Sequence, residues 1–352
     1  MSSLGLPVLV ALFVAAAAAV WIAGIKVSET TDVLAGRLGL GDALGGLIVL
    51  AVVTNLPELA IVCSGAASGD LSLAVGNILG GIAAQTVVLA LLDRFGSPPG
   101  EPLTYRAASL LLVLEGLLVV VILGLVLVGT QMPADQVFAR TTPVTLMIVV
   151  TWMAGVKLIA AKGHALPWHD TGHPPEHQEV PRGAAKRAAA EKAAEAKRST
   201  AAVGATFGIG ALVTLVAGVV LEQSSGAIAD RIGMSGAIFG ATVLAAATSL
   251  PELSTGLTSV RLGDYEMAFG DVFGGNAFLP VLFAAAVAIS GKAVLPAAGR
   301  TDLYLTAGGI VVTVIYLGGL IVRPRRTVVG VGVDSALVLA TYAVLVVGLA
   351  FV

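Results

Sequence analysis

Two glutamates in this chain of 352 residues lie in stretches that are otherwise apolar enough to cross a bilayer. Glu58 follows Pro57 in VLAVVTNLPELAIV, and Glu252 follows Pro251 in VLAAATSLPELSTG. Because an ionised carboxylate is costly within a membrane, an acid in such a place is a candidate for function. One glutamate alone is compatible with a protonated side chain that is hydrogen-bonded inside a helix bundle. Two equivalent glutamates, each directly after a proline, indicate an ion-binding site.

The prolines add backbone oxygens to this predicted site. Proline has no N–H and its ring collides with the carbonyl four residues earlier, so each proline leaves a helical carbonyl without its partner. Within a bilayer such a carbonyl needs another partner, and a cation is a suitable one. Further oxygens on the same turns come from Thr54, Asn55, Thr248 and Ser249. Carboxylate and neutral oxygens suit a hard cation such as Ca²⁺, whereas the lack of nearby Cys or His argues against a soft metal.

The two glutamates belong to an internal duplication. Segments 49–85 and 243–279 align without a gap at a constant offset of 194 residues. At that offset the two LPEL motifs coincide, Gly69-Asp70 matches Gly263-Asp264, and Gly80-Gly81 matches Gly274-Gly275. Self-similarity at a fixed offset is the signature of a repeated structural unit. We expect the two units to span about 37–92 and about 231–289.

The composition places most of the chain in lipid. Charged residues make up 12% of the chain and apolar residues 57%, whereas soluble domains have about 25% charged residues. A net charge of −2 gives no indication of a nucleic acid partner. The single cysteine, Cys63, excludes an internal disulfide framework and a thiol metal site. We therefore expect an integral membrane protein whose partners are the lipid bilayer and inorganic cations.

Ten apolar runs have the length needed to cross the roughly 30 Å core of a bilayer. We interpret the first as a retained transmembrane helix, because it lacks the basic segment that precedes a cleaved signal peptide. The sequence thus predicts an all-α polytopic membrane protein with ten transmembrane helices. Their approximate bounds are 6–25, 43–67, 70–92, 105–128, 141–161, 201–221, 236–259, 266–289, 302–322 and 331–351.

Each half of the chain holds five of these runs. Because five is odd, the second half must be inserted upside down relative to the first, which is the inverted-topology arrangement of secondary transporters with a site near the membrane midplane. We expect an N-terminal half at 1–162, a connecting loop at 163–200 and a C-terminal half at 201–352. With the N-terminus outside, fifteen Lys and Arg residues fall on the inner side and four on the outer side. This bias predicts outside termini, a cytoplasmic loop, and location in the plasma (cell inner) membrane.

The connecting loop is the one substantial polar segment. Its first part is rich in proline, and its second part has Ala, Lys, Arg and Glu at the spacing of a solvated helix. All four histidines lie in the first part, at His164, His169, His173 and His177. A regulatory metal or pH site is one interpretation of them. We favour a flexible polar loop in which the histidines have no common role.

The motifs resemble those of a known family. TNLPEL and TSLPEL, followed by SGDLSLAVGNILGG and LGDYEMAFGDVFGGN, are similar to the two alpha-repeats of the sodium/calcium exchanger branch of the calcium/cation antiporter superfamily. The resemblance implies ten helices in inverted halves, over nearly the whole chain. It also implies a central Ca²⁺ site made by Glu58 and Glu252, with backbone oxygens of Thr54 and Thr248. Flanking Na⁺ sites would use Asn55, Ser249, a serine in each GSN motif, and an Asn or Asp four positions later.

The chain departs from that family pattern around the sodium sites. Gly81 and Gly275 replace the two GSN serines, Asn276 is present only in the second copy, and the later positions hold Gln85 and Leu279. Several side-chain oxygens expected around Na⁺ are therefore missing, which leaves Ca²⁺/H⁺ exchange open, since a carboxyl group in a low dielectric can carry a proton.

Two further residues fill the GN position of the repeats, Asn77 in the first and Asp271 in the second. Asp271 is either an outer or entry ligand of the cation or a solvated residue at a helix end. Glu115 and Lys157, within the fourth and fifth helices, are expected to form a buried ion pair that braces the bundle.

We therefore expect an antiporter that exchanges Ca²⁺ for Na⁺ by alternating access, with helices one and six moving past the core, as the resemblance suggests. Ca²⁺/H⁺ or other cation/H⁺ exchange at the same glutamates is the alternative. A cation channel is a weaker one, because a repeated, proline-broken architecture favours an exchanger. The chain lacks HExxH and GxSxG motifs, so we expect no enzyme and no resident cofactor. Ca²⁺, Na⁺ and H⁺ are cargo, and we expect a functional monomer.

Overall fold

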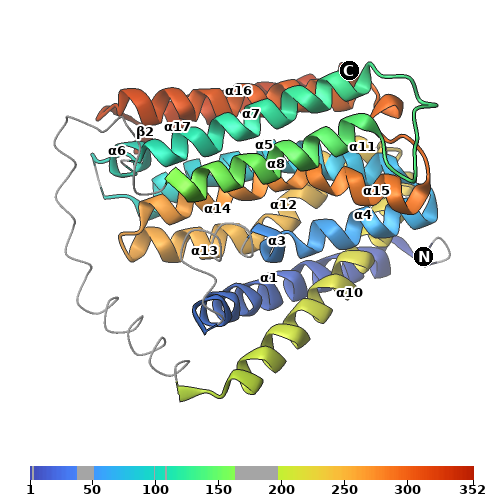
Figure 1. Ribbon diagram of the computed structural model, residues 1–352, viewed down its shortest axis with the longest axis horizontal. Coiled ribbons are helices and arrows are strands. Elements are labelled where there is room, and N and C mark those ends of the chain that lie inside the picture. Colours follow the sequence, from blue (N-terminus) through green and yellow to red (C-terminus); the bar gives the residue numbers. More distant parts are fainter. Residues whose placement is uncertain (2–3, 38–50, 99, 108, 163–196) are drawn as a thin grey trace.

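The computed structural model describes residues 1, 4–37, 51–98, 100–107, 109–162 and 197–352 (Figure 1). The four histidines and the expected cytoplasmic helix lie outside the described residues, as does the start of the expected second span. Almost all described residues are helical. The two strands, β1 (Thr327–Val328) and β2 (Val331–Gly332), form a two-stranded antiparallel hairpin. The long helices are α1 (Leu6–Arg37), α5 (Leu71–Gly96), α7 (Leu110–Thr130), α8 (Pro143–Lys162), α10 (Thr200–Ile232) and α16 (Arg300–Val322).

Shorter helical elements complete the bundle. In the first half these are α3 (Ala51–Thr54), α4 (Leu56–Ser68) and α6 (Leu103–Arg106). In the second half these are α11 (Gly236–Phe239), the π-helix η2 (Gly240–Leu244), α12 (Ala245–Thr248), α13 (Leu250–Arg261), α14 (Tyr265–Phe278), the 3-10 turn η3 (Leu279–Val281), α15 (Leu282–Ser290), the 3-10 turn η4 (Leu295–Ala297) and α17 (Val333–Gly348).

The chain is an integral membrane protein. Its described residues contain seven helices that are long and apolar enough to cross a membrane, or eight if the pair Gly236–Thr248 and Leu250–Arg261, bent by 41°, is one span. The other two expected spans correspond to the shorter apolar helices α4 and α17, and residues just before α4 are not described. The count of ten and the inversion of the halves stay predictions, with which this arrangement agrees.

Two helices extend beyond the apolar runs that are expected to cross the bilayer. The first and sixth runs are expected at about 6–25 and 201–221, and α1 continues to Arg37 and α10 to Ile232. Polar side chains in the extra turns donate hydrogen bonds to backbone carbonyls of their own helix. The hydroxyl of Thr31 donates to the carbonyl of Val27 at 2.7 Å, and the hydroxyl of Ser224 donates to the carbonyl of Val220 at 2.6 Å. These helices can therefore continue after the apolar run ends.

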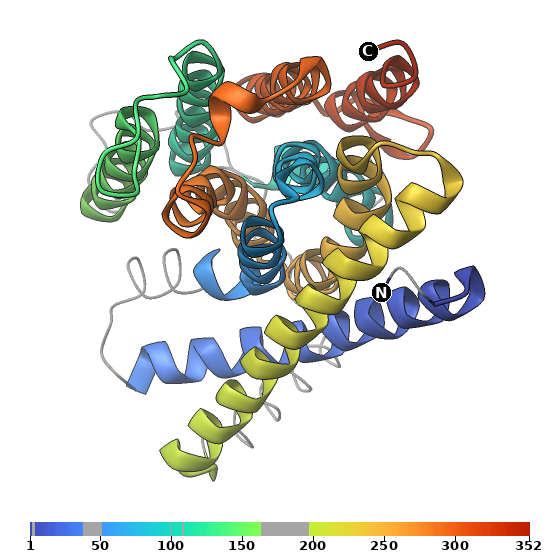
Figure 2. The ribbon, with the colours of Figure 1, turned by 90° about the vertical axis from the view of Figure 1, so that its right-hand side faces the viewer.

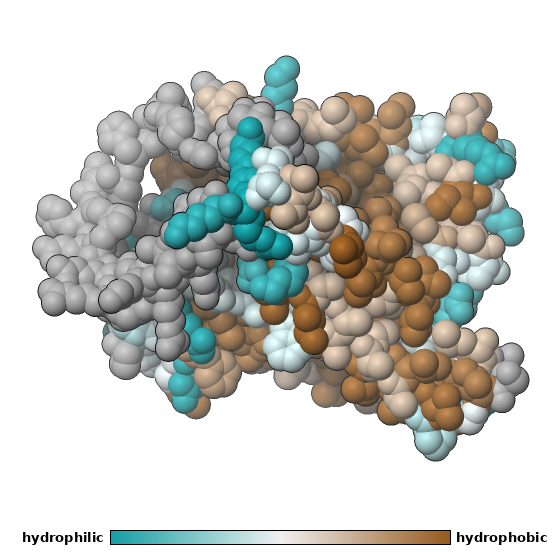
Figure 3. Space-filling view, turned by 90° about the horizontal axis from the view of Figure 1, so that it is seen from below, coloured by the Kyte–Doolittle hydropathy of each residue, from teal (hydrophilic) through white to brown (hydrophobic). Residues whose placement is uncertain are grey.

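The helices form a block with two outer helices laid across it. The most apolar stretch of α5 is 89% buried, whereas those of α1 and α10 are 28% buried, so α5 is the centre of the bundle and α1 and α10 form its edge. Figure 2 shows α1 and α10 crossing one another along one side of the other helices. On the face seen from that side, apolar side chains spread over the middle and hydrophilic ones gather toward the ends (Figure 3).

The two repeats have the same local backbone. Gly69 ends α4 and Gly263 follows α13, both with a φ of +83°, a value that favours glycine. Asp70 and Asp264 then precede α5 and α14 with closely similar dihedral angles. The sequence duplication is therefore accompanied by the same Gly-Asp turn in both copies.

Candidate ion-binding site

Both proline motifs break their helices at the same position. Between α3 and α4 the helix is interrupted at Asn55 (φ −91°, ψ 19°), and between α12 and α13 at Ser249 (φ −84°, ψ 0°). In each case a new helix begins within two residues, with the proline in its first turn, where its missing N–H costs nothing. The expected disruption at Pro57 and Pro251 is present, and it sets each glutamate in the first turn of a new helix.

The two glutamates lie together inside the protein. Glu58 is 1% exposed and Glu252 is 2% exposed. The carboxyl of Glu252 interacts electrostatically with those of Glu58 and Asp271. Among the described residues, none of the four glutamate oxygens makes a hydrogen bond of normal geometry. Buried carboxylates this close to each other need a cation or protons to compensate their charge.

The carboxylates alone do not form a complete cation site. No three Asp, Glu, His or Cys side chains converge closely enough, within the described part of the chain, to hold a metal by themselves. A cation between Glu58 and Glu252 therefore needs other oxygens, and buried threonines are nearby. Thr248 of the second half lies within interaction range of the Glu58 carboxyl, and its hydroxyl donates to the carbonyl of Ala245 at 3.3 Å. Thr54 is 5% exposed at the corresponding place in the first half.

One flank of the glutamate pair is polar. A Cβ atom placed on Gly275 would lie 3.2 Å from Nδ2 of Asn55 and 3.7 Å from Oε1 of Gln85. Both side chains are buried, and Oε1 of Gln85 meets no donor in the described structure. Asn55, Gln85 and the backbone of Gly275 thus form what we call the polar flank, which offers amide oxygens without a serine.

The matching flank of the other repeat is apolar. A Cβ atom placed on Gly81 would face Cδ1 of Leu279 at 3.8 Å. The hydroxyl of Ser249 donates to the carbonyl of Ala245 at 2.7 Å, within its own helix. Leu279, the counterpart of Gln85, therefore supplies no side-chain oxygen, and the two flanks of the site differ.

The remaining predicted residues have separate surroundings. Asn276 donates to the carbonyl of Ile82 at 3.3 Å and to Oγ1 of Thr86 at 3.1 Å, so it ties α14 to α5. Asn77 is fully buried in α5, and neither atom of its amide group has a partner among the described residues. Asp271 lies half-buried within α14 and accepts a hydrogen bond from Thr255 at 2.9 Å. Asp271 interacts electrostatically with Glu252 and lies inside α14, so it is close to the glutamate pair; a role as a cation ligand stays a prediction.

Comparison with known sequences now identifies the family. The sequence profile described as "sodium/calcium exchanger protein" matches residues 8–161 and 202–351, which is most of the chain. The chain belongs to this sodium/calcium exchanger family. The match covers both halves and leaves out mainly the connecting segment.

Two individual relatives are each 25% identical to this exchanger-family chain over the aligned residues. It is 25% identical over 289 residues to CaxA, a candidate antiporter of Alkalimonas amylolytica. This alignment covers 81% of this chain and 82% of CaxA. It is also 25% identical over 249 residues to the inner membrane protein YrbG of Escherichia coli K12, which covers 70% of this chain and 69% of that one.

Solved structures share the fold. The chain matches the sodium–calcium exchanger NCX_Mj soaked with 10 mM Na⁺ and 10 mM Sr²⁺ at a TM-score of 0.60 and 16% identity, over 97% of this chain and 99% of that one. The form soaked without Na⁺ and Ca²⁺ gives 0.58 and 17%, over 98% and 100%. At this identity the match establishes the fold of the exchanger-family chain.

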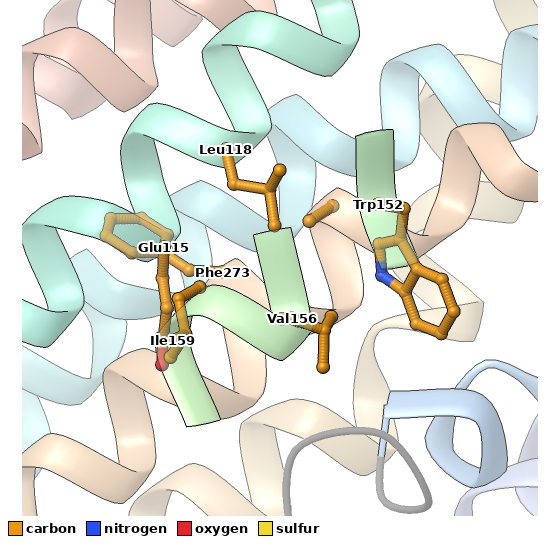
Figure 4. A pocket seen from close by; sticks show the side chains of 8 residues that line it. Glu115, Leu118, Trp152, Val156, Ile159 and Phe273 are labelled. Atoms are coloured by element: carbon orange, nitrogen blue, oxygen red, sulfur yellow. The ribbon is translucent and has the colours of Figure 1, made fainter. Parts of the chain in front are cut away.

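One expected ion pair of this exchanger-family chain is wrong. Lys157 is exposed on α8, whereas Glu115 is buried in α7 and faces α14, where a Cβ atom on Gly270 would lie 3.5 Å from its Oε2. Figure 4 shows Glu115 in a small pocket near Phe273, Ile159 and other apolar side chains. The sequence shows that Glu115 and Lys157 each lie in an apolar run, but not which way each side chain points. Lys157 points outward, where its long aliphatic stem lets the ammonium group reach the membrane–water interface.

The sequence analysis also missed an acid of the outer helices. Glu222 of α10 is 6% exposed and accepts a hydrogen bond from Ser64 of α4 at 2.8 Å. Glu222 comes directly after the apolar run predicted as the sixth span (201–221), and a longer predicted span would include it. This contact joins an outer helix to α4, which carries Glu58 in its first turn.

Proposed function

We propose that the protein is a secondary active antiporter that exchanges Ca²⁺ for Na⁺ across the membrane at the paired-glutamate site, Glu58 and Glu252. The observation that carries this proposal is the meeting of two buried carboxylates from the two repeats, neither of which makes a hydrogen bond of normal geometry in the described structure. Oxygen ligands with two negative charges suit Ca²⁺, which takes six to eight such ligands. Thr54 and Thr248 complete the proposed metal site.

Coupling follows from the charge of this site. Without a cation, two ionised carboxylates in a low-dielectric interior repel one another, so the empty site is costly to move between the two sides of the membrane. Either a divalent cation or a set of monovalent ones removes that cost. The protein therefore changes access only when loaded, which couples the inward flux of one ion to the outward flux of the other.

The outer helices are suited to the change of access. Helices α1 and α10 lie at the edge of the bundle and pack on one another, on α4 and on α13, which begin at the two glutamate motifs. Movement of this pair past the block can open the site to one side at a time. We also propose that the termini are outside, that the protein acts as a monomer, and that it resides in the plasma (cell inner) membrane.

The asymmetry of the two flanks favours a second candidate, Ca²⁺/H⁺ exchange. Leu279 and Gly81 provide no side-chain oxygen on their flank, so fewer Na⁺ ions can be held than on two polar flanks. The glutamates themselves can then carry the counter-ions, because a buried carboxyl binds a proton more readily than an exposed one.

Uptake of ⁴⁵Ca²⁺ into proteoliposomes tests the proposal. Vesicles loaded with Na⁺ are expected to take up Ca²⁺, and Glu58→Gln and Glu252→Gln are each expected to abolish this uptake. Glu115→Gln is the matched control, because it neutralises a buried glutamate outside the site and should retain uptake. Uptake that persists in both site variants would contradict the proposal. Uptake driven by a pH gradient instead of a Na⁺ gradient would select the second candidate, and flux without any counter-ion gradient would indicate a channel.

A further inference from the structure

A second pair of buried carboxylates lies away from the paired-glutamate site. Asp93 is near the end of α5 and Asp334 is in the first turn of α17; they are 3% and 5% exposed. Figure 1 shows α6 and β2 at this end of the bundle, and both of them contact α5. Asp93 follows Gln85 of the polar flank by eight residues, which is roughly 12 Å along a helix. We call this pair the two-aspartate site.

Asp93 is held in place by backbone donors. Its Oδ1 accepts a hydrogen bond from the N–H of Leu103 at 2.8 Å, and its Oδ2 accepts one from the N–H of Gly332 at 2.6 Å. These two hydrogen bonds fix the carboxyl of Asp93 at the junction of α5, α6 and β2.

Asp334 faces the same space, but neither of its oxygens makes a hydrogen bond of normal geometry in the described structure. The donors near its carboxyl are the buried hydroxyl of Thr104 and the backbone N–H groups of Ser335 and of Asp334 itself. A Cβ atom on Gly332 would lie 2.5 Å from Oδ1 of Asp334 and 3.2 Å from Oδ2 of Asp93. The two carboxyl groups thus approach one another across the space that the absent Gly332 side chain leaves.

No described basic side chain neutralises this pair. The two ion pairs found among the described residues are Lys26–Glu29 and Arg106–Glu101. Arg94, the nearest base in sequence, is exposed and lies beside Gly330. The other titratable neighbour, Tyr316, donates its hydroxyl to Oγ of Ser335 at 3.2 Å. The space between the carboxyl groups is therefore lined by their oxygens and by Cβ of Pro102, and no described basic side chain forms an ion pair with either acid.

We propose that Asp93 and Asp334, together with the hydroxyl of Thr104, bind a hard divalent cation at a second site. Two carboxylates and a hydroxyl are the ligand types that Ca²⁺ and Mg²⁺ prefer, and no thiol or imidazole is present among them. The cation coordinates the oxygens of Asp334 and offsets the repulsion between the two acids. By bridging the two residues it fastens α17 and the β1–β2 hairpin to the central helix α5. This ion stays bound during transport and is distinct from the exchanged one.

Binding to the full-length protein with the paired-glutamate site removed tests this second site. In the variant Glu58→Gln/Glu252→Gln, purified in detergent, equilibrium dialysis with ⁴⁵Ca²⁺ is expected to give one bound ion per chain. Saturating Ca²⁺ is expected to raise the midpoint of thermal unfolding by about 5 °C, because the ion binds only the folded protein. Adding Asp334→Asn is expected to remove both effects. Adding Asp302→Asn, another buried aspartate in a first helical turn, should leave both unchanged.

A second variant, Thr104→Val, tests the proposal if the Asp334→Asn protein does not fold. Thr104→Val replaces threonine with a side chain of the same shape that lacks the hydroxyl, so the protein should still fold. In the Glu58→Gln/Glu252→Gln protein, this change is expected to weaken Ca²⁺ binding at least tenfold. Absence of bound Ca²⁺ in the Glu58→Gln/Glu252→Gln protein, or binding that is unchanged by Asp334→Asn and Thr104→Val, would overturn the proposal. Stabilisation by acid in metal-free buffer that equals the effect of Ca²⁺ would assign a shared proton to the two aspartates, and would overturn it too.

Discussion

Gly24 of α1 lies against the ring of Pro251, so that a Cβ atom on Gly24 would be 3.0 Å from Cγ of that proline. The equivalent glycine of the second half, Gly218 of α10, lies against Pro57, with a Cβ atom 2.9 Å from the carbonyl oxygen of Pro57. Each outer helix therefore contacts, through a glycine, the proline that precedes the glutamate of the opposite half. Such close contacts between small residues and a neighbouring backbone are how helices approach one another in membranes.

These contacts predict that replacing glycine with alanine destabilises the protein at one position of α10 but not at another. Gly218→Ala places a methyl group against Ala60 and Pro57, and should lower the free energy of unfolding by about 1–3 kcal/mol. Gly226→Ala is the control, because nothing lies within 4 Å of that position, and it should be neutral or stabilise by up to roughly 1 kcal/mol. The thermal unfolding of both variants in detergent measures the difference. Equal stability of the two variants would show that α10 does not pack on Pro57 as described.

The polar flank predicts where a monovalent counter-ion is bound. Gln85→Leu removes an amide oxygen that faces Asn55 and Gly275, and should reduce Na⁺-driven ⁴⁵Ca²⁺ uptake about tenfold, since a hydrogen-bonding group that contacts a charge contributes about 1.5–3 kcal/mol. Gly81→Ala on the apolar flank should leave uptake unchanged, because Leu279 is at an ordinary contact distance there. Unchanged Na⁺-driven uptake in Gln85→Leu would contradict a role for this flank.

Asp271 should tune Ca²⁺ affinity without being required for transport. Asp271→Asn keeps an oxygen that can accept the hydrogen bond from Thr255 but removes the negative charge near Glu252. At an intermediate dielectric this charge contributes on the order of 1 kcal/mol, so the Ca²⁺ concentration for half-maximal uptake should rise roughly 3- to 10-fold. Asp264→Asn serves as the control, because Asp264 is an exposed cap of the same helix. A complete loss of uptake in Asp271→Asn would instead make Asp271 a direct ligand.

The separation of Lys157 from Glu115 predicts that the two residues do not stabilise each other. Lys157→Gln should change the free energy of unfolding by no more than about 0.5 kcal/mol, as is usual for an exposed side chain. A double-mutant cycle with Glu115→Gln should give a coupling energy near zero, within about 0.5 kcal/mol. The contacting pair Arg106 and Glu101 provides a positive control, with an expected coupling of about 0.5–1 kcal/mol. A larger coupling for Glu115 and Lys157 would restore the expected ion pair.

Much of the site could be predicted from the sequence because its causes are local. A proline breaks the helical hydrogen bonding of its own segment wherever that segment packs, so the interruptions at Asn55 and Ser249 follow from Pro57 and Pro251. The duplication at a constant offset predicted that the two glutamates occupy corresponding positions in the two repeats. The burial of both carboxyls and the matching turns at Gly69 and Gly263 agree with this prediction.

Only the tertiary structure decided which way each helix faces. In water the polar side of a helix shows which face is buried, but these helices are apolar all round, because lipid and protein interior are both apolar. For this reason the sequence did not show that Lys157 points outward, that Gly275 faces Asn55 and Gln85, or that Leu279 occupies the opposite flank. The approach of Asp334 to Asp93, 241 residues apart in the chain, likewise depends on how α17 crosses the end of α5.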